Sequence, residues 1–373
     1  MVVPTKKYCF YMRFRLLVAA IIVLLVISTI TQMRQPLLEN TAKHTNCDCN
    51  VTMTTMTTRL DLESAQKGTS QQSSVKNMMG ISGRDKLSSY HGMSDPMEDL
   101  TIVTAYFDLG SFRKGPSQTF STKTYTDWVK TFKYLNNSLV VYTDSVVFRD
   151  FFRRLRKGME NRTKIVLMNR TQFWTFQIRD KIQKVFSQKG YPKHYPNTVL
   201  PAYSCAQHTK YAAVADTIRK KYFRSKCYAW LDIGYFRDIV NSKRYFSLNL
   251  LDDFDKNKLS VNLVYPSVSL NISYKAIVYG NHVWVGGGMF IGTADVITAF
   301  ETEYQRAVTF LLDKQLMSTD QQVLLSMYSL QGQKDLNVTV QLQLYSRKQN
   351  ETNLKNDNPW FYLGYKCLNF TST

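Results

Sequence analysis

Three short segments with acidic or hydroxyl side chains follow apolar runs that are typical of buried β-strands. They are Tyr106-Phe107-Asp108, Thr143-Asp144 and Asp232-Ile233-Gly234-Tyr235. Ligands of an open α/β sheet bind beyond the carboxyl ends of its strands, so these segments are candidate binding positions. Each one alone is a weak indication because apolar strands commonly end in a carboxylate. Together they indicate one edge of a sheet where chemistry could take place.

Asp232 is the most informative of these residues. The run YAWL at residues 228–231 would bury its strand and bring the carboxylate to the rim of the sheet. An oxygen ligand there suits a divalent cation that bridges two phosphates. We therefore predict Asp232 as a catalytic and metal-binding residue, with His282 as a second candidate metal ligand. The structural alternatives are that Asp232 caps a helix or pairs with Arg237, and that His282 is a structural histidine beside apolar residues.

Two further charged residues are candidates for catalysis. Asp320 opens an amphipathic helical pattern, where the helix macrodipole favours a carboxylate, and in an enzyme it could accept a proton from an acceptor hydroxyl. Lys210 and His208 begin a basic helical pattern that leads to the Asp232 strand. A cation in this position could stabilise a departing diphosphate. Helix-start electrostatics alone is the alternative for Asp320.

The segment WVGGGMFIG at residues 284–292 carries four glycines in seven positions. Its backbone must approach another group closely or adopt positive φ angles. It lacks the Gly-Lys-Ser/Thr ending of a phosphate loop. We predict a backbone shelf beneath a sugar or nucleotide, and a tight turn between two strands is the alternative. The shelf residues are Gly286, Gly287 and Gly288, walled by Trp284 and Phe290.

Short β-branched runs alternate with helical patterns between residues 100 and 330. The predicted strands span residues 100–107, 138–143, 164–168 and 227–233, and the predicted helices span residues 119–135, 147–156, 173–186, 204–222, 293–312 and 319–330. The last helix opens with Thr319-Asp320-Gln321-Gln322, a capping box. This alternation predicts an α/β fold with a mixed, mostly parallel central sheet and helices on both faces.

Composition limits the class of protein. The chain has 373 residues, of which 44% are apolar and 20% charged, so it is not a disordered, collagen-like or many-spanning membrane protein. A formal net charge of +20 indicates a polyanionic partner such as nucleic acid, a membrane surface, an acidic glycan or a phosphate-bearing substrate. Residues 149–226 concentrate this charge, with 19 basic and 4 acidic side chains. They form either solvated helix faces or a surface that attracts an anion.

Residues 16–33 form an apolar run preceded by Lys6, Lys7, Arg13 and Arg15. The run is just long enough to cross the thinner membranes of the early secretory pathway, and the positive-inside rule leaves the N-terminus cytoplasmic. We predict a cytoplasmic tail at residues 1–15 and a signal-anchor transmembrane helix at residues 16–33. The protein would be a single-pass type II protein of the Golgi or endoplasmic reticulum membrane. A cleaved signal peptide is the alternative.

The rest of the chain is expected in the lumen. Residues 34–98 are rich in Thr, Ser, Gln and Met, with Tyr90 as their one aromatic residue, which predicts a flexible stem. Residues 99–373 form the predicted globular domain. All eight Asn-x-Ser/Thr sequons of the sequence lie beyond the predicted span, in agreement with a glycosylated luminal body. This placement argues against nucleic acid as a partner.

The six cysteines indicate no zinc site because the sequence lacks a Cys-x-x-Cys pair. Cys205 and Cys227 bracket a predicted helix roughly 30 Å long, which is too far apart for a disulfide. Cys367 could bridge to one of them. Cys47 or Cys49 in the stem could link two chains into a disulfide-bonded dimer.

Five blocks of the sequence, taken in order, resemble the HtrL/YibB-like family of glycosyltransferase-related proteins. The blocks are residues 101–108 (TIVTAYFD), 139–144 (LVVYTD), 230–237 (WLDIGYFR), 284–292 (WVGGGMFIG) and 320–322 (DQQ). The resemblance implies a nucleotide-diphospho-sugar transferase fold of the GT-A type. In that fold a short acidic motif after a central strand holds the metal of the sugar nucleotide, and Asp232 stands where this motif begins.

One departure from the GT-A pattern leaves the metal open. Enzymes of this type usually carry Asp-x-Asp, whereas this chain has Asp232-Ile233-Gly234. Either His282 or Asp144 completes the metal shell, or catalysis uses Lys210 and neighbouring arginines without a metal. A third alternative is that the domain binds sugar nucleotides without turning them over.

The resemblance and the residues together predict a type II membrane glycosyltransferase. It would move a sugar from a nucleotide-diphosphate donor to a glycan or glycoprotein acceptor, with manganese or magnesium as the expected metal. Tyr106 and Asp144 are expected to line the base and ribose pocket, the glycine shelf and Trp284 to shape the sugar site, and Asp320 to act as the base. The alternative is a non-catalytic carbohydrate-binding or adhesion protein that retained the fold.

Overall fold

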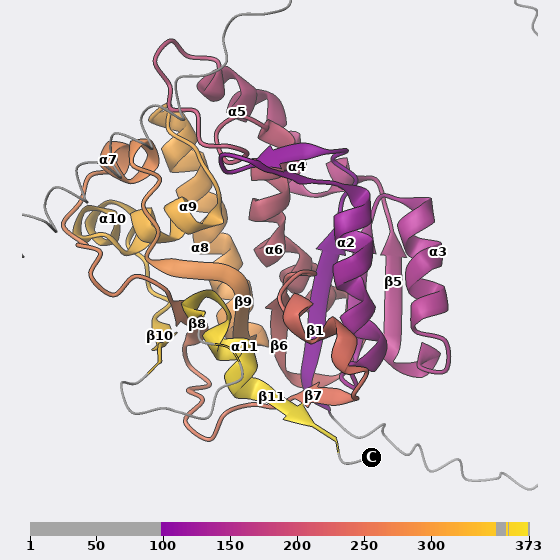
Figure 1. The fold of residues 1–373 in the computed structure, drawn as a ribbon. Helices are drawn as coiled ribbons and strands as arrows, with labels where there is room; N and C mark the ends of the chain where they lie inside the picture. Colours follow the sequence, from indigo (N-terminus) through magenta and orange to yellow (C-terminus); the bar gives the residue numbers. More distant parts are fainter. Residues whose placement is uncertain (1–97, 348–355, 357, 372–373) are drawn as a thin grey trace, which may run out of the picture. The chain divides into compact units, whose positions relative to one another are not determined.

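A seven-stranded mixed sheet lies at the centre of the described part of the protein. The computed structural model describes residues 98–347, 356 and 358–371 (Figure 1), all of them within the compact unit Ser88–Thr373. The predicted cytoplasmic tail, the predicted transmembrane span and the predicted stem up to residue 97, with Cys47 and Cys49, lie outside the described residues. No helix within the described ranges is long and apolar enough to cross a membrane.

Six of the seven strands run in one direction. The strands are β1 (Glu98–Tyr106), β4 (Leu139–Thr143), β5 (Thr163–Leu167), β6 (Ser225–Leu231), β8 (Leu259–Leu263), β9 (Val285–Thr293) and β10 (Leu342–Tyr345). Their order across the sheet is β10-β8-β9-β6-β1-β4-β5. Strand β9 is antiparallel to both of its neighbours, and the other neighbouring strands are parallel. The predicted mixed, mostly parallel sheet is confirmed.

Helices cover both faces of this sheet (Figure 1). One face carries α4 (Trp174–Gln177), α5 (Arg179–Phe186), α6 (Pro201–Lys220), α7 (Tyr274–Tyr279), α8 (Ala294–Asp313), α9 (Asp320–Tyr328) and α10 (Leu330–Leu336). The opposite face carries the 3-10 helix η1 (Val129–Tyr134), α3 (Val146–Leu155) and α11 (Tyr362–Cys367). The described elements also include α2 (Thr122–Trp128), the hairpin β2 (Phe112–Lys114) and β3 (Gln118–Phe120), the pair β7 (Phe246–Leu248) and β11 (Leu368–Phe370), and the 3-10 helices η2 (Glu160–Arg162), η3 (Arg170–Gln172), η4 (Arg237–Ser242) and η5 (Pro359–Phe361).

The alternation of side chains along each strand divides the core into two clusters. In β4, Val140 and Tyr142 pack into the cluster on the α6 side, whereas Leu139 and Val141 pack into the cluster on the α3 side. All four are completely buried. A continuous apolar run therefore forms a strand here because both of its faces are removed from water.

Two predicted helices differ from the structure. The predicted helix at residues 119–135 begins only at Thr122, because Gln118–Phe120 is a strand and Ser121 is the extended N-cap residue. The predicted helix at residues 173–186 is two helices, α4 and α5, which meet at Ile178. The glycine-dense segment forms strand β9, so the alternative of a tight turn is wrong.

The described cysteines are free thiols. Cys205, Cys227 and Cys367 are all buried, so the expected bridge from Cys367 is wrong and the expected lack of a bridge between Cys205 and Cys227 is confirmed. The reason for the free Cys205 is its position on the α6 side of the sheet, whereas Cys227 and Cys367 pack on the other side. Burial raises the pKa of each thiol, to about 12 for Cys205 and Cys367 and about 11 for Cys227.

Candidate active site

A large cleft opens at the carboxyl ends of β1 and β6. Its volume is about 980 Å³, and both strands contribute their last residues to its lining. This volume is at the upper end of the range for small-molecule sites, and the position is where ligands of open α/β sheets bind. The cleft is therefore the candidate active site.

Lys210 lies at the floor of the cleft and is nearly inaccessible, at 2% exposure. Its Nζ atom is 3.3 Å from Asp232 Oδ1 and 3.1 Å from Asp320 Oδ2. It also donates a hydrogen bond of 2.8 Å to the backbone carbonyl of Gly287. The three acceptors come from the end of β6, the start of α9 and the middle of β9. One ammonium group thus joins three elements that are distant in the sequence.

The helical repeat of α6 directs Lys210 toward the cleft. Pro201 begins this helix at a position where its missing N–H costs nothing. Tyr203, Gln207 and Lys210 then follow at intervals of four and three, which places them on one face of the helix. All three line the cleft.

Asp232 is the accessible carboxylate of the site. Its side chain is 40% exposed and lies directly after β6. Its backbone N–H donates to Gly288 O at 2.8 Å, and the indole N–H of Trp230 donates to Asp232 Oδ1 at 2.7 Å. The strand pairing and the indole therefore fix the carboxylate at the rim. Its cationic partner is Lys210. The alternative of an ion pair with Arg237 is wrong, because Arg237 donates to the Gly234 carbonyl instead.

Asp320 lies behind Lys210 and is almost completely buried, at 1% exposure. It is the first residue of α9, where Thr319 and Gln322 form the predicted capping box. Its carboxylate lies against the Lys210 ammonium, with Nζ 3.1 Å from Oδ2. Burial raises the pKa of Asp320, and the Lys210 charge offsets part of this effect. Burial alone would lower the pKa of Lys210, but the two carboxylates outweigh it and the pKa is raised.

Aromatic side chains from several elements form the walls of the cleft. The hairpin β2–β3 contributes Phe112 and Phe120, α2 contributes Tyr125 and Trp128, and η5 contributes Trp360 and Phe361. Flat aromatic faces can stack on a nucleotide base or on the apolar face of a sugar ring. The sequence patterns did not predict this wall, because its members are far apart in the chain and meet only in the folded protein.

Two exposed cations line the same cleft. The Arg237 guanidinium lies over the rings of Trp128 and Phe361, at 5.4 and 4.7 Å from their centroids, and the Lys114 ammonium lies 5.0 Å from the centroid of Phe120. Within the described ranges neither cation forms an ion pair with a carboxylate. Arg237 donates one hydrogen bond to the Gly234 carbonyl at 3.2 Å, and its other N–H groups and the Lys114 ammonium can bind an anionic ligand in the cleft.

Lys114 interacts electrostatically with the charged residues of the cleft floor. Lys114 is an exposed residue that lines the cleft. Partial loss of water lowers the pKa of Lys114, the neighbouring cations Lys210 and Arg237 lower it further, and Asp232 partly offsets these effects. No sequence pattern indicated Lys114, and Arg237 was predicted only as an alternative partner for Asp232. The structure adds both to the site.

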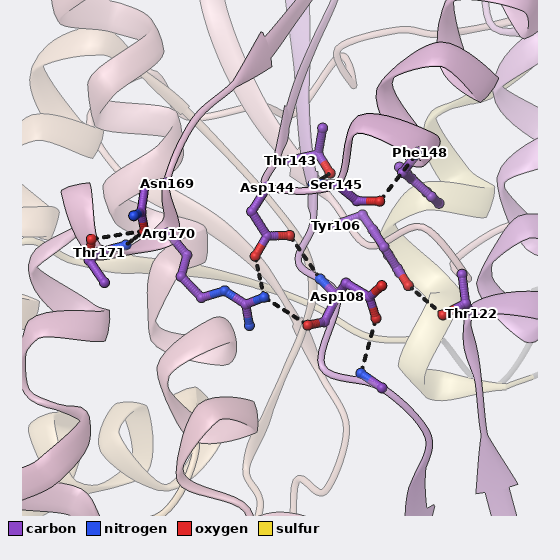
Figure 2. Close-up of polar contacts among 11 residues, drawn as sticks. Tyr106, Asp108, Thr122, Thr143, Asp144, Ser145, Phe148, Asn169, Arg170 and Thr171 are labelled. Atoms are coloured by element: carbon purple, nitrogen blue, oxygen red, sulfur yellow. Dashed lines mark hydrogen bonds and ion pairs between the residues drawn. The ribbon is translucent and has the colours of Figure 1, made fainter. Parts of the chain in front are cut away.

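Of the residues predicted for the base and ribose, the structure brings Tyr106 to the cleft and leaves Asp144 outside it. Tyr106 stacks on Phe148 with ring centroids 3.9 Å apart, and its hydroxyl donates to Thr122 Oγ1 at 3.0 Å. Figure 2 shows Asp144 in an ion pair with Arg170 and accepting the backbone N–H of Asp108 at 2.9 Å. Asp144 therefore holds the loop after β1 in place.

The predicted glycine shelf reaches the cleft at one position. Gly288 lines it, next to Tyr235 and Asp232, whereas Gly286, Gly287 and Trp284 do not. Trp284 is 8% exposed and packs in the core, with its ring centroid 6.0 Å from that of Tyr328. The glycine backbone does approach another group closely, as expected. At Gly287 this group is the Asp320 side chain and not a ligand in the cleft.

The side chains at the cleft floor do not fit a divalent cation as they are arranged. Asp232 and His282 both line the cleft, but no group of three or more His, Cys, Asp and Glu side chains in the described part of the chain is placed to hold a metal. Asp232 and Asp320, the two carboxylates nearest each other here, already share the Lys210 ammonium. A hard cation needs several free oxygen ligands, and these two are engaged.

An open, mixed α/β sheet with a charged, aromatic-walled cleft at the carboxyl ends of its strands defines an α/β protein with a candidate ligand-binding site. The chain belongs to the HtrL_YibB family, described as "Bacterial protein of unknown function", whose profile matches residues 98–338. The predicted family membership is thus confirmed. The matched region contains Lys210, Asp232 and Asp320, whereas the wall residues Trp360 and Phe361 lie beyond it.

Two individual proteins are similar to this chain. Protein HtrL of Escherichia coli (strain K12) is 24% identical over 244 residues, which cover 61% of this chain and 83% of that protein. Among solved structures, the apo form of mouse xyloside xylosyltransferase 1 is similar at 9% sequence identity and a TM-score of 0.33, over 66% of this chain and 85% of that one.

Proposed function

We propose that this protein is a glycosyltransferase that moves a sugar from a nucleoside diphosphate donor to a glycan or glycoprotein acceptor. The observation that supports this most directly is the content of one cleft. An accessible carboxylate, Asp232, shares it with two exposed cations, Lys114 and Arg237, between aromatic walls. A sugar nucleotide presents the matching groups, namely a flat base, an anionic diphosphate and a sugar with hydroxyl groups.

The charged side chains of the cleft suit the two groups that change charge in a glycosyl transfer, namely the acceptor hydroxyl and the leaving diphosphate. The acceptor hydroxyl gives its proton to a carboxylate of the cleft while its oxygen bonds to the anomeric carbon. The bond from that carbon to the diphosphate oxygen breaks, and the diphosphate leaves with the electron pair. Lys114 and Arg237 are the candidates to neutralise the negative charge that develops there. Asp232 is the carboxylate that a cleft-bound ligand can reach. Asp320, which the sequence predicted as the base, lies behind Lys210 at 1% exposure.

Binding of nucleotides to the full chain in detergent tests this proposal. Titration calorimetry with UDP, GDP and CMP, each with and without manganese, should find one nucleotide that binds. We expect Arg237→Ala to weaken that binding by about tenfold or more, because a charge-assisted contact is lost. Arg153→Ala is the matched control, since Arg153 is an exposed arginine of α3 that pairs with Asp150. Failure of all three nucleotides to bind the wild-type protein would refute the proposal.

A non-catalytic carbohydrate-binding or adhesion protein is the second candidate. It is favoured by one observation, namely that both carboxylates of the cleft floor are paired with Lys210. Asp232→Asn separates the two functions. In a transferase this substitution should abolish sugar transfer and leave nucleotide binding largely intact. In a binding protein the wild type shows no transfer or donor hydrolysis, and the substitution leaves glycan binding unchanged.

The site of action is also a proposal. We infer from the sequence that a signal-anchor helix at residues 16–33 holds the protein in the Golgi or endoplasmic reticulum membrane, with the globular domain in the lumen. The support is the apolar run, the basic residues before it and the sequons after it. Sugar nucleotides and glycan acceptors would meet in that compartment.

A further inference from the structure

We propose that the Lys210 ammonium permanently occupies the cation position of the donor site, so that this protein binds a nucleoside diphosphate without a divalent metal. This inference rests on the proposed function. It also explains why the chain carries Asp232-Ile233-Gly234 where a second carboxylate would be expected.

The surroundings of Lys210 Nζ are those of a small cation site. Three oxygens surround it, at 3.3 Å from Asp232, 3.1 Å from Asp320 and 2.8 Å from the Gly287 carbonyl. Carboxylate and backbone carbonyl oxygens are the ligands that hard divalent cations prefer in proteins. An ammonium group has three N–H donors. This site offers three acceptors, the Asp232 carboxylate, the Asp320 carboxylate and the Gly287 carbonyl.

Asp320 shows that the ammonium is needed where it lies. The carboxylate is 1% exposed, and the Lys210 ammonium lies 3.1 Å from its Oδ2 atom. A buried carboxylate is costly unless an opposite charge lies against it. Its one ion-pair partner within the described part of the chain is Lys210. The site therefore requires a cation at all times and not only when a ligand is bound.

The glycine at position 287 makes room for this arrangement. A Cβ atom there would overlap Asp320 Oδ2 and lie 3.2 Å from Lys210 Nζ. With a side chain at this position, the strand could not approach the lysine and the carboxylate together. Gly287 thus allows β9 to supply the third oxygen ligand.

The positive charge that contacts the diphosphate must then come from other residues. Because Lys210 faces three protein oxygens, its N–H groups are already engaged. Arg237 and Lys114 line the same cleft and form no ion pair with a carboxylate of the described ranges. We assign the diphosphate contacts to these two cations, and we assign to Lys210 the charge that keeps Asp232 and Asp320 together beneath them.

The first test compares nucleotide binding to the wild-type full chain in EDTA and in manganese. The probe is whichever of UDP and GDP binds more tightly in the titration above. We expect its dissociation constant to change by less than about twofold. Nucleotide binding that needs manganese, with a tenfold or greater loss in EDTA, overturns this inference and leaves the proposed function intact. Absence of binding under both conditions overturns the proposed function itself.

The second test asks whether a metal can replace the ammonium, and it needs no nucleotide. Lys210→Ala leaves two carboxylates and a carbonyl around an empty space. We expect this variant to bind one Mn²⁺ per chain, measured by the loss of the free-ion signal in electron paramagnetic resonance, while the wild type binds none. Lys210→Ala/Asp320→Asn is the matched control and should lose the gained site. A folded Lys210→Ala chain without the gained Mn²⁺ contradicts the inference. If that variant does not fold, the comparison in EDTA decides.

Discussion

At the scale of single residues, Gly287 determines how closely a strand and a helix start can pack. We predict that Gly287→Ala destabilises the protein by about 3 kcal/mol, because the new Cβ would overlap the buried Asp320 carboxylate. Gly286→Ala is the matched control on the same strand. Its Cβ would lie 3.1 Å from Val264 Cγ2, a contact that small shifts can relieve. Urea denaturation of both variants measures the difference, and equal losses of stability would contradict the prediction.

His208, two residues before Lys210 on α6, provides a test of pH dependence. It is fully buried, with Nδ1 2.6 Å from the Tyr304 hydroxyl and Nε2 3.2 Å from Ser204 Oγ. Burial lowers the pKa of His208 to about 3, and the nearby Lys210 charge contributes to the shift. The unfolded chain has a histidine pKa of about 6.5. Above that pH both states are neutral, whereas below it only the unfolded state takes up the proton.

We therefore predict that His208 makes the free energy of unfolding fall as the pH drops below about 6.5, by at most 1.4 kcal/mol per pH unit. Urea denaturation at pH 7 and pH 5 of the wild type and of His208→Gln measures this contribution as a difference of about 2 kcal/mol. His194→Gln, which removes a partly exposed histidine, should behave like the wild type. The same acid sensitivity in wild type and His208→Gln would show that His208 is not its source.

At the scale of elements, the sequence predicted what depends on local apolar patterns. The run at residues 139–143 is β-branched and uniformly buried, so it was recognised as a strand. Strand β9 was not recognised, because glycines favour no regular structure and its direction is set by β6 and β8 on either side. The hairpin of β2 and β3 was also missed, since its strands are three residues long and mostly exposed.

For the residues of the site, too, local sequence predicted the individual residues but not the contacts that depend on packing. Asp232, Lys210 and Asp320 were all predicted, because each has a charge at the end of a predicted strand or near the start of a predicted helix. Their contact with one another could not be predicted, since it depends on how β6, α6 and α9 pack. Lys114 acquires its position from the β2–β3 hairpin, for which the local sequence contains no distinctive pattern. Arg237 acquires its position from the turn after β6, and its contacts with Trp128 and Phe361 depend on elements distant in the chain.

Arg156 joins several elements on the α3 side of the sheet. It follows α3, is 2% exposed and donates to Phe132 O at 2.8 Å, to Thr163 Oγ1 at 2.9 Å and to Leu135 O. Burial lowers the pKa of Arg156 to about 10, so the side chain remains charged at neutral pH. These hydrogen bonds tie the end of α3 to η1 and to β5. The guanidinium thus supplies hydrogen-bond donors to two buried backbone carbonyls at the end of η1.

We predict that Arg156→Met lowers the free energy of unfolding by about 3 kcal/mol, because it removes the hydrogen bonds that the guanidinium donates to buried carbonyl groups. Arg153→Met, on the exposed side of the same helix with a side chain 64% accessible, is the matched control and should change stability by less than about 0.5 kcal/mol. Thermal and urea denaturation both measure the effect. Comparable values for the two variants would mean that the hydrogen bonds of Arg156 contribute little.

At the scale of the whole molecule, most of the basic side chains between residues 149 and 226 are exposed. Exposed basic residues of α3 and α5 include Arg153, Arg154, Lys181 and Lys184, whereas Lys210 and Arg156 are buried. Exposure agrees with both predicted alternatives, solvated helix faces and a surface that attracts an anion. The cations available to a ligand in the cleft, Lys114 and Arg237, come from outside this window.

The sequons provide a test of where the globular domain resides. Six of the eight lie in the described ranges, and five of these six have an exposed asparagine, namely Asn161, Asn169, Asn271, Asn337 and Asn369. Glycosylation needs an accessible asparagine in the lumen, so exposure and compartment are separate conditions. The structure supports the first condition at these five positions. The second condition is the proposed type II topology.

We predict that the full chain, expressed in a eukaryotic cell, carries N-linked glycans and shifts to lower mass on treatment with an N-glycosidase. Replacing Asn161 and Asn271 by Gln should each remove one glycan, because both side chains are exposed. In sealed microsomes the globular domain should resist added protease until detergent is present, whereas a tag at the N-terminus should be cleaved. A cytosolic domain would carry no glycan and would be digested without detergent, because oligosaccharide transfer and protection both require the lumen. That result would contradict the topology and leave the chemistry of the cleft unaffected.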